Sequence, residues 1–109
     1  MPNGMILLAW DGQDVAGVVA LRPLNEKNIC EMKRLFVRND WRGQGLGERL
    51  ASKIIKFSTS VGYSKMRIDT EARLKEAIKL YKKLGFIEIE KYYNNPLDNI
   101  IYMERNLSV

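Results

Sequence analysis

The six residues Arg42-Gly43-Gln44-Gly45-Leu46-Gly47 decide the fold of this chain. They follow an apolar, strand-like run at 32–37 and open an amphipathic helical pattern. A strand, a glycine turn and a helix start together form an arrangement that binds phosphate, because glycine lets the backbone approach an anion closely. The free N–H groups of the first helical turn point at the anion, and the helix dipole favours its negative charge. On these residues alone, a phosphate site and a plain turn are both open.

Strand and helix patterns lie on both sides of the glycine turn. Before it we expect strands at 5–10, 15–21 and 29–37, the first two joined by a hairpin turn at 11–14. After it we expect helices at 45–62 and 74–84, and strands at 65–70, 86–90 and 99–104. The continuous apolar run at 35–37 predicts a bulge or burial on both faces. This order predicts an α/β (α+β) fold: a mixed, mostly antiparallel sheet flanked by helices, in a single domain over residues 1–109.

Composition narrows the classes of function. The formal net charge of +5 favours a polyanionic partner (nucleic acid, a membrane surface or a multiply phosphorylated cofactor), although a solvated lysine-rich surface explains it equally. The chain has no histidine, which excludes the common Ser-His, Cys-His and zinc constellations, so no metal site is expected. Cys30 lies in an apolar strand pattern and is expected to be a buried, inert thiol. With no apolar run of ~18 residues and no signal-peptide pattern at 1–4, we expect a cytoplasmic protein without a membrane partner.

The glycine turn matches neither of two common phosphate motifs. No Gly-Lys-Ser/Thr follows it, and the Gly-x-Gly-x-x-Gly spacing is absent. The spacing that is present, Arg42-x-x-Gly45-x-Gly47, resembles the Gln/Arg-x-x-Gly-x-Gly/Ala signature of the GNAT superfamily of N-acetyltransferases. The strand at 31–37 looks like the fourth strand of that family, and the run Ala-Ile-Lys-Leu-Tyr-Lys-Lys-Leu-Gly-Phe at 77–86 looks like its late helix. The matches together cover residues 5–107.

The resemblance implies that the cofactor is acetyl-CoA, which leaves the reaction as coenzyme A. It implies that backbone amides of the turn hold the pyrophosphate; the turn residues are Arg42, Gly43, Gln44, Gly45, Leu46 and Gly47. The pantetheine arm would pair with the backbone of Leu35, Phe36 and Val37, and the amide of Phe36 or Val37 would donate to the thioester oxygen. Arg42 and Arg38 would add charge-assisted contacts, although Arg38 as a solvated strand end is equally open.

Two side chains are candidates for catalysis. By the resemblance, Tyr81 protonates the leaving thiolate; the alternative is that it completes an apolar helix stripe. Glu31 is the candidate base for the attacking ammonium, and the alternative is an exposed carboxylate that pairs with Lys33 or Arg22 across the sheet. We expect Asp69 and Thr70 to cap the following helix, and the alternative is a contact with the cofactor or the acceptor.

Two features depart from the family pattern. Members usually carry a strand and one or two helices before the first hairpin, where only residues 1–4 stand here. In the family, these helices form much of the wall that binds the acceptor. We therefore expect either a shortened gene product or a partner chain that supplies this wall. We also expect an uncovered apolar surface and self-association, for example as a homodimer. The second departure is Leu74, at a position where many members carry a cofactor-binding Asn, so one cofactor contact is expected to be missing or replaced.

The sequence supports three functional hypotheses. The first is transfer of an acetyl group from acetyl-CoA to a primary amine of a small molecule or peptide, by direct attack in a ternary complex. The second is a CoA-binding GNAT fold with little or no catalysis, because the acceptor-side elements are absent. The third is a basic nucleic-acid module with Tyr92 and Tyr93 as stacking groups, which we rank last because no interleaved basic and aromatic stripe is present.

Overall fold

The order of helices and strands is the predicted one, and each boundary lies within about two residues of its expected place. The computed structural model describes residues 4–107; Met1 to Asn3, on which the absence of a signal peptide was partly argued, lie outside that range. The elements are β1 (Met5–Asp11), β2 (Asp14–Pro23), β3 (Ile29–Val37), the 3-10 turn η1 (Asn39–Trp41), α1 (Leu46–Ser60), β4 (Lys65–Glu71), α2 (Lys75–Lys83), β5 (Ile87–Ile89) and β6 (Ile100–Asn106).

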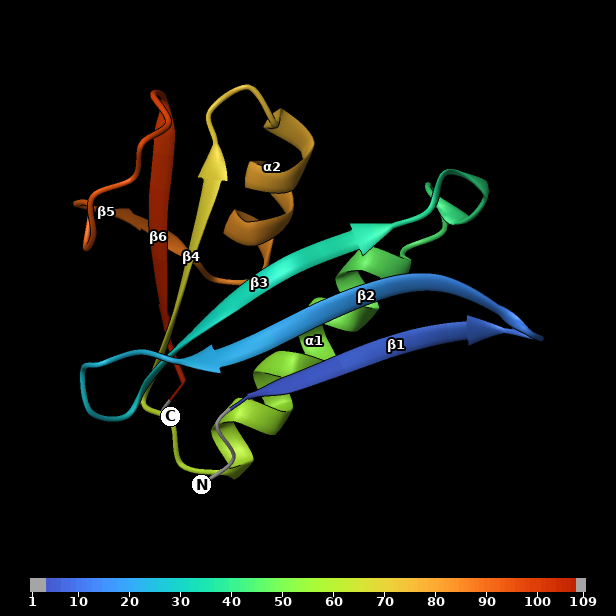
Figure 1. The fold of residues 1–109 in the computed structure, drawn as a ribbon, viewed down its shortest axis with the longest axis horizontal. Helices are drawn as coiled ribbons and strands as arrows, with labels where there is room; N and C mark the ends of the chain where they lie inside the picture. Colours follow the sequence, from blue (N-terminus) through green and yellow to red (C-terminus); the bar gives the residue numbers. More distant parts are fainter. Residues whose placement is uncertain (1–3, 108–109) are drawn as a thin grey trace.

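The strands form one six-stranded sheet in the order β1-β2-β3-β4-β6-β5 (Figure 1). All neighbouring pairs are antiparallel except β3 and β4, which are parallel. A parallel pair needs a crossover, and α1 supplies it. The mixed, mostly antiparallel sheet with helices packed on it confirms the predicted fold class.

Strands β3 and β4 pair over a short distance only. Their register joins Ile29 to Lys65, Cys30 to Met66 and Glu31 to Arg67, and then stops. Figure 1 shows the two strands separating toward their carboxyl ends, with α2 near the opening. The sheet is therefore split along its middle on the side where the glycine turn follows β3.

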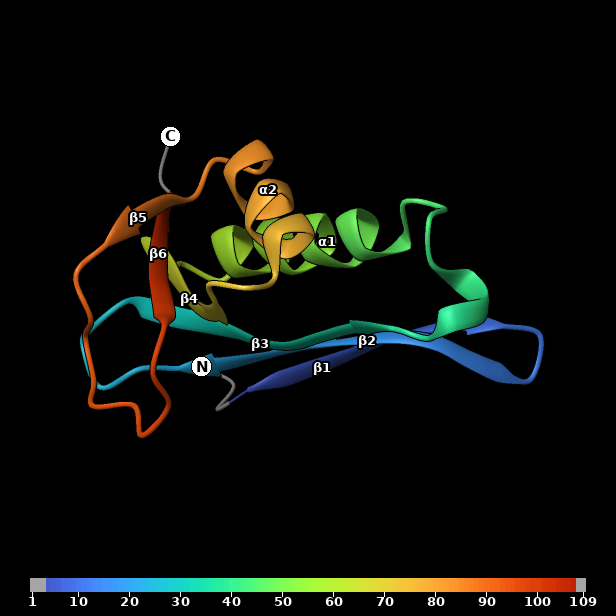
Figure 2. The same cartoon turned by 90° about the horizontal axis from the view of Figure 1, so that it is seen from above.

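Both helices lie on the same face of the sheet, as Figure 2 shows. Helix α1 packs on β2 and β3, and Gly17 of β2 allows the close approach. A methyl group added at Gly17 would lie 2.9 Å from Leu50 of α1 and 3.0 Å from the carbonyl oxygen of Phe36. The core between the helices and the sheet includes the fully buried side chains of Val19, Ile54, Met66, Ile68, Phe86 and Met103.

The opposite face of β1, β2 and β3 carries apolar side chains that neither α1 nor α2 covers. Leu8, Val18 and Phe36 form one cross-strand row there. The large apolar side chains Ile6, Leu8, Trp10 and Phe36, called the apolar face below, are between 46% and 65% exposed. The uncovered apolar surface expected from the sequence is thus confirmed, whereas self-association stays a prediction.

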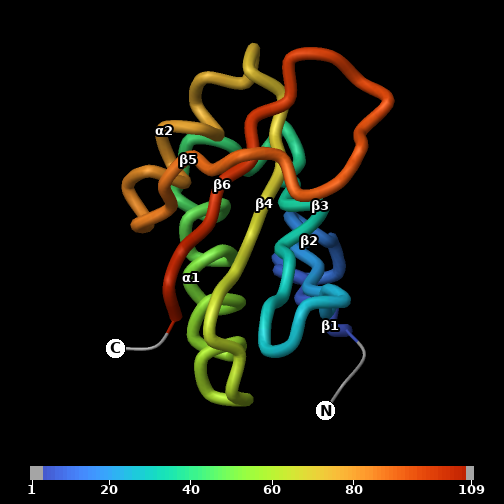
Figure 3. The backbone as a smooth tube through the Cα atoms, turned by 90° about the vertical axis from the view of Figure 1, so that its left-hand side faces the viewer, coloured from blue at the N-terminus to red at the C-terminus, as the bar shows by residue number. Residues whose placement is uncertain are grey.

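The segment between β5 and β6, residues 90–99, extends from the edge of the sheet past β4 toward β3. Figure 3 shows it extending beyond β4 toward the side that α1 and α2 leave free. Tyr92 in this segment donates a hydrogen bond to Glu31 of β3, so the segment lies against the middle of the sheet. None of the helices in the described part of the chain has the length and apolar composition needed to cross a membrane.

Candidate active site

The glycine turn between η1 and α1 has the geometry of an anion cradle. Gly43 and Gly45 have φ angles of +79° and +78°, in the left-handed region that side chains disfavour. A Cβ added at either glycine would meet nothing within 4 Å, so the space in front of the turn is open. Helix α1 begins directly after Gly45, and no side chain caps its first amides. Open space, uncapped amides and a helix N-terminus together fit a diphosphate group.

Two arginines flank this turn, and both already contact the protein. Arg42 donates from Nε to the carbonyl oxygen of Val37 at 2.8 Å, and its guanidinium lies 5.3 Å from the centre of the Phe36 ring. Arg38 lies 5.7 Å from the Trp41 ring and donates to the carbonyl oxygen of Val15 at 3.4 Å. Both side chains are exposed, so each keeps donors for an added anion. The solvated alternative for Arg38 is compatible with this placement.

The predicted bulge lies in β3 at Arg34. In the register of β2 and β3, Val18 faces Phe36 and Ala20 faces Lys33, so both Arg34 and Leu35 stand opposite one residue of β2. Arg34 has a φ of +57°, which places the extra residue in the left-handed region. Beyond the bulge, the amide of Arg38 donates to β2 at the carbonyl oxygen of Ala16, 2.8 Å away.

The direction of the Arg38 amide decides between the two candidate oxyanion donors. Amides alternate between the two edges of a strand. Because Arg38 donates toward β2, the amide of Val37 points to the opposite edge, where β4 has separated from β3. The geometry therefore favours Val37 over Phe36 as an N–H group directed into the split of the sheet.

Tyr81 borders the split from the side of α2. A cavity of about 310 Å³ is lined by Arg34 and Leu35 of β3, Asp69 of β4 and Tyr81 of α2, together with Thr70, Glu71, Leu74, Ala77, Asn95, Leu97 and Ile100. Burial, and then the nearby carboxylate of Asp69, raise the pKa of the Tyr81 phenol above its usual value. The phenol therefore keeps its proton at neutral pH, beside the same cavity as Leu35.

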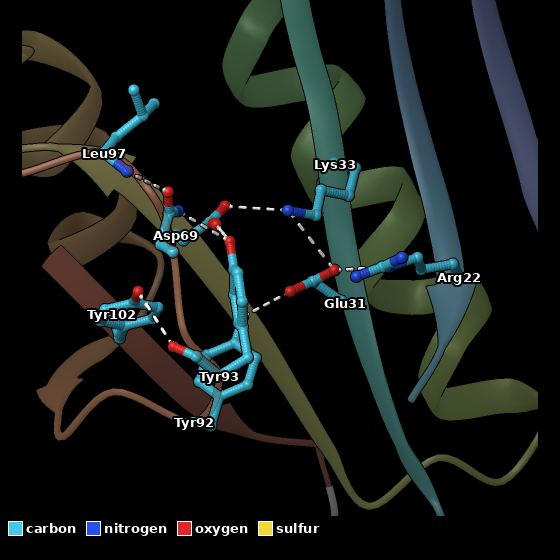
Figure 4. Close-up of polar contacts among 9 residues, drawn as sticks. Arg22, Glu31, Lys33, Asp69, Tyr92, Tyr93, Leu97 and Tyr102 are labelled. Carbon is cyan, nitrogen blue, oxygen red and sulfur yellow. Dashed lines mark hydrogen bonds and ion pairs between the residues drawn. The ribbon is translucent and has the colours of Figure 1, made fainter. Parts of the chain in front are cut away.

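Glu31 is fully buried, contrary to the exposed strand carboxylate that was one expectation. One oxygen, Oε1, accepts from Arg22 at 2.6 Å and lies 3.6 Å from the Lys33 ammonium, while Oε2 accepts from the Tyr92 hydroxyl at 2.5 Å (Figure 4). The pairing with both basic neighbours is confirmed. Both oxygens are occupied, so this geometry supports the ion-pair alternative for Glu31 more directly than the role of base.

Asp69 does not cap helix α2, and that expectation for residues 69–70 was wrong. The helix is preceded by Leu74 without any side-chain cap. The carboxylate of Asp69 instead accepts from Lys33 at 3.1 Å and from the Tyr93 hydroxyl (Figure 4). Asp69 points across the split toward β3 because its ammonium partner lies there, and this joins the two separated strands through side chains.

The tyrosine pair at 92–93 is the part of the site that the sequence did not reveal. The rings of Tyr92, Tyr93 and Tyr102 pack edge to face, with centroids 5.3 to 5.5 Å apart. The Tyr92 ring also lies 4.9 Å from the guanidinium of Arg67. Their rings and hydroxyls are engaged within the protein, so the nucleic-acid hypothesis loses its two stacking groups. Only the adjacent placement of two tyrosines before Asn94-Asn95-Pro96 hinted at this cluster.

Cys30 is buried in β3, as expected, and is not part of the lining of the 310 Å³ cavity. Its Sγ lies 3.5 Å from the carbonyl oxygen of Lys65, to which the thiol donates. Burial raises the pKa of the thiol to about 11, which keeps it in the unreactive protonated form. The placement agrees with the expectation of an inert thiol.

Comparison with known proteins agrees with this geometry. Residues 1–86 match the Acetyltransferase (GNAT) family, which covers most of the chain. An uncharacterized N-acetyltransferase of Schizosaccharomyces pombe, C1271.07c, is 44% identical over 108 residues, which are 98% of this chain and 66% of that protein. An N-acetylaspartate synthetase of Xenopus tropicalis is 38% identical over 72 residues, 66% of this chain and 27% of that protein. The chain belongs to the GNAT acetyltransferase family.

A solved structure supports the fold independently. An acetyltransferase of Bacillus subtilis, solved in complex with CoA, superposes with a TM-score of 0.80 over 95% of this chain and 77% of that chain, at 20% sequence identity. At this identity the likeness concerns the fold. This chain spans about two thirds of the length of the yeast relative and about a quarter of the length of the Xenopus relative.

Proposed function

We propose that this chain transfers an acetyl group from acetyl-CoA to a primary amine, by direct attack in a ternary complex. The observation that carries the proposal is the split between β3 and β4, which stop pairing after Glu31 and Arg67. The glycine turn lies at the end of β3, and the cavity that borders Leu35 and Tyr81 lies beside the split. An anion cradle and a slot for an extended chain thus adjoin, which suits a ligand with a diphosphate and a long thioester arm.

In this proposal the backbone of the turn holds the diphosphate; the residues are Arg42, Gly43, Gln44, Gly45, Leu46 and Gly47, with Arg38 as an added cation. Acetyl-CoA supplies an acetyl group activated as a thioester. The strand residues Leu35, Phe36 and Val37 lie along its arm, and the Val37 amide stabilises negative charge on the acyl oxygen. Tyr81 holds a proton at its phenol oxygen for the departing thiol.

The resemblance makes Glu31 the candidate base that takes the proton from the attacking ammonium. Its oxygens accept from Arg22 and Tyr92, so a direct base role requires one of these partners to yield. Glu31→Gln separates the two roles, because the amide oxygen still accepts a hydrogen bond while the charge is lost. A base predicts a roughly 100-fold loss of kcat with unchanged acetyl-CoA affinity. An ion-pair role predicts mainly a lower stability against urea.

The relatives bear on the acceptor only through their names. The Xenopus relative is named N-acetylaspartate synthetase, and its name specifies an acidic amino acid as the acetylated product. That protein matches this chain over 72 residues, so we carry over only the reaction class, acetylation of an amine nitrogen. We also propose that the cytoplasm is the site of action.

Titration with acetyl-CoA tests the cofactor site. Gly45→Glu places a carboxylate in the open space of the cradle, so binding should fall below detection by calorimetry. Gly12→Glu is the matched control: Gly12 has a φ of +62° in the β1–β2 hairpin, and a Cβ there also meets nothing within 4 Å. Both variants carry the same backbone strain, and only the first should lose binding. Unchanged affinity in Gly45→Glu would overturn the cofactor site.

Thiol release over a panel of amines tests the reaction. Release of CoA in the presence of an amine supports the transferase. Acetyl-CoA binding without release on any amine would instead support the CoA-binding alternative. Salt-dependent binding to oligonucleotides, with none to acetyl-CoA, would support the nucleic-acid alternative.

A further inference from the structure

A second, larger cavity lies on the face of the sheet that α1 and α2 leave free. Its volume is about 860 Å³, within the range of small-molecule sites. Its floor is the cross-strand row of Ile6, Ala20 and Lys33, and Tyr93 borders it from the segment between β5 and β6. Arg34 lines both this cavity and the 310 Å³ cavity that holds Tyr81. The two cavities therefore adjoin at the bulge of β3.

The lining of the larger cavity is positively charged. Arg22, Lys33 and Arg34 border it, and no acidic side chain of residues 4–107 is part of its lining. Arg22 and Lys33 are compensated by Glu31 and Asp69, as Figure 4 shows. The side chain of Arg34 makes no hydrogen bond and no ion pair with any residue between 4 and 107, whereas its neighbour Lys33 pairs with Glu31 and Asp69. One positive charge at the junction of the two cavities is therefore uncompensated.

The backbone of Arg34 adds a second observation. With a φ of +57°, this residue occupies a conformation that glycine and asparagine adopt more easily than arginine. This conformation belongs to the bulge of β3, and the bulge places Arg34 between the two cavities. The exposed side chain is thus placed at the junction without a hydrogen-bond or ion-pair partner among residues 4–107, where a ligand can reach it.

We propose that the acceptor is a small amine that also carries a carboxylate, and that Arg34 binds this carboxylate. The inference deepens the proposed function and rests on it. A guanidinium offers two parallel donors that match the two oxygens of a carboxylate. Binding at Arg34 holds the acceptor at the junction, with its amino group free to enter the cavity that borders Leu35 and Tyr81. A polyamine brings no carboxylate for Arg34, the one cation of this lining without an ion-pair partner among residues 4–107, and is disfavoured.

Matched pairs of acceptors test this inference. For wild-type protein, kcat/KM for an α-amino acid should exceed that for its carboxamide by at least about tenfold, the factor for about 1.4 kcal/mol. In Arg34→Gln the ratio should fall toward one, and Arg34→Lys should restore part of it because the charge returns without the fork. Lys56→Gln, at an exposed cation of α1 that lines neither cavity, should leave the ratio unchanged.

Saturation-transfer NMR with the same amino acid and its carboxamide measures binding without turnover. Selective binding of the acid by wild-type protein, lost in Arg34→Gln, supports the inference even if no acetylation is found. Equal use or equal binding of acid and amide, or a preference for a diamine, overturns it and leaves the proposed function intact. Failure of acetyl-CoA to bind overturns the proposed function instead, and the NMR comparison still decides whether the pocket selects a carboxylate.

Discussion

The hydroxyl of Tyr92 donates a 2.5 Å hydrogen bond to the carboxylate of Glu31, across 61 positions of the sequence. Glu31 is fully buried, and a buried carboxylate is costly unless its oxygens are paired. The bond therefore does two things: it satisfies an oxygen in the middle of the sheet, and it fixes the segment between β5 and β6 against β3. That segment carries Tyr93, which borders the larger cavity of about 860 Å³.

Tyr92→Phe should lower the free energy of unfolding by about 1–3 kcal/mol, because it leaves a buried carboxylate oxygen without its donor. The ring remains, so packing on Tyr93 and Tyr102 is kept. Urea unfolding measures the loss. Tyr102→Phe is the control, since the Tyr102 hydroxyl reaches the carbonyl oxygen of Tyr93 only at 3.4 Å and should contribute less. Equal losses in the two variants would contradict the argument.

The same bond predicts a pH dependence. Burial first, and then the hydrogen bond to Glu31, raise the pKa of the Tyr92 phenol above its usual value of 10.0. In the unfolded chain the phenol loses its proton near pH ~10, whereas in the folded chain it holds it to higher pH. The contribution of Tyr92 to stability is therefore complete below about pH 10 and declines above it.

The measurement is the difference in unfolding free energy between wild type and Tyr92→Phe at about pH 8 and about pH 11. All other titrating groups are shared by the two proteins. The difference should shrink at the higher pH, and a difference that grows would show that the sign of the pKa shift is wrong.

Cys30 should resist modification in the folded protein. Its side chain is fully buried, and the pKa of about 11 keeps the thiolate scarce at neutral pH. Reaction with a disulfide reagent should be at least roughly 100-fold slower in buffer than in denaturant, since it must await opening of the fold. Fast labelling under native conditions would contradict the buried placement.

Tyr81→Phe should lower kcat roughly 100-fold and leave acetyl-CoA affinity unchanged, if the phenol supplies the proton of the departing thiol. Because the pKa of Tyr81 is raised, ionisation of its phenol should not reduce turnover at any pH under ~10. Tyr63→Phe is a matched control, because Tyr63 is also a buried tyrosine but borders neither cavity. A similar loss of kcat in both variants would indicate a general structural effect.

The apolar face should drive self-association at high protein concentration. Ile6, Leu8, Trp10 and Phe36 gather there on three neighbouring strands, and patches of this kind mark interaction surfaces. Sedimentation equilibrium should show a mass above that of one chain for wild type and a smaller association constant for Leu8→Lys. A monomeric mass for wild type at high concentration would count against the prediction.

Much of the fold followed from periodic patterns. The stripe that includes Leu50 and Ile54 predicted α1, and the one that includes Ile78 and Tyr81 predicted α2. Both are local regularities, with one apolar residue for each turn of helix. The apolar run at 35–37 likewise indicated a bulge or burial on both faces, because apolar and polar residues stop alternating there, and the bulge lies at the start of this run, at Arg34 and Leu35.

The polar part of the site did not follow from the sequence, for physical reasons. Asp69 was expected to act locally as a cap, but its partners Lys33 and Tyr93 come from segments remote in the chain. Tyr92 meets Glu31 only because the segment between β5 and β6 folds back over the sheet. Such pairs depend on tertiary approach and leave no periodic trace. The left-handed backbone of Arg34 could not be predicted either, because arginine has no preference for that conformation.

Gly17 lies in β2 and touches no ligand cavity, yet it determines how low α1 can sit on the sheet. A single methyl group there would lie 2.9 Å from the side chain of Leu50 and 3.0 Å from the backbone oxygen of Phe36, so Leu50, and α1 with it, would be pushed away from the sheet unless the side chain repacked. Leu46, the first residue of α1, is also among its neighbours, so the rise would carry the amide end of the helix away from Val37. The spacing between the glycine turn and the end of β3 thus depends on the single hydrogen atom that glycine carries in place of a side chain on the neighbouring strand.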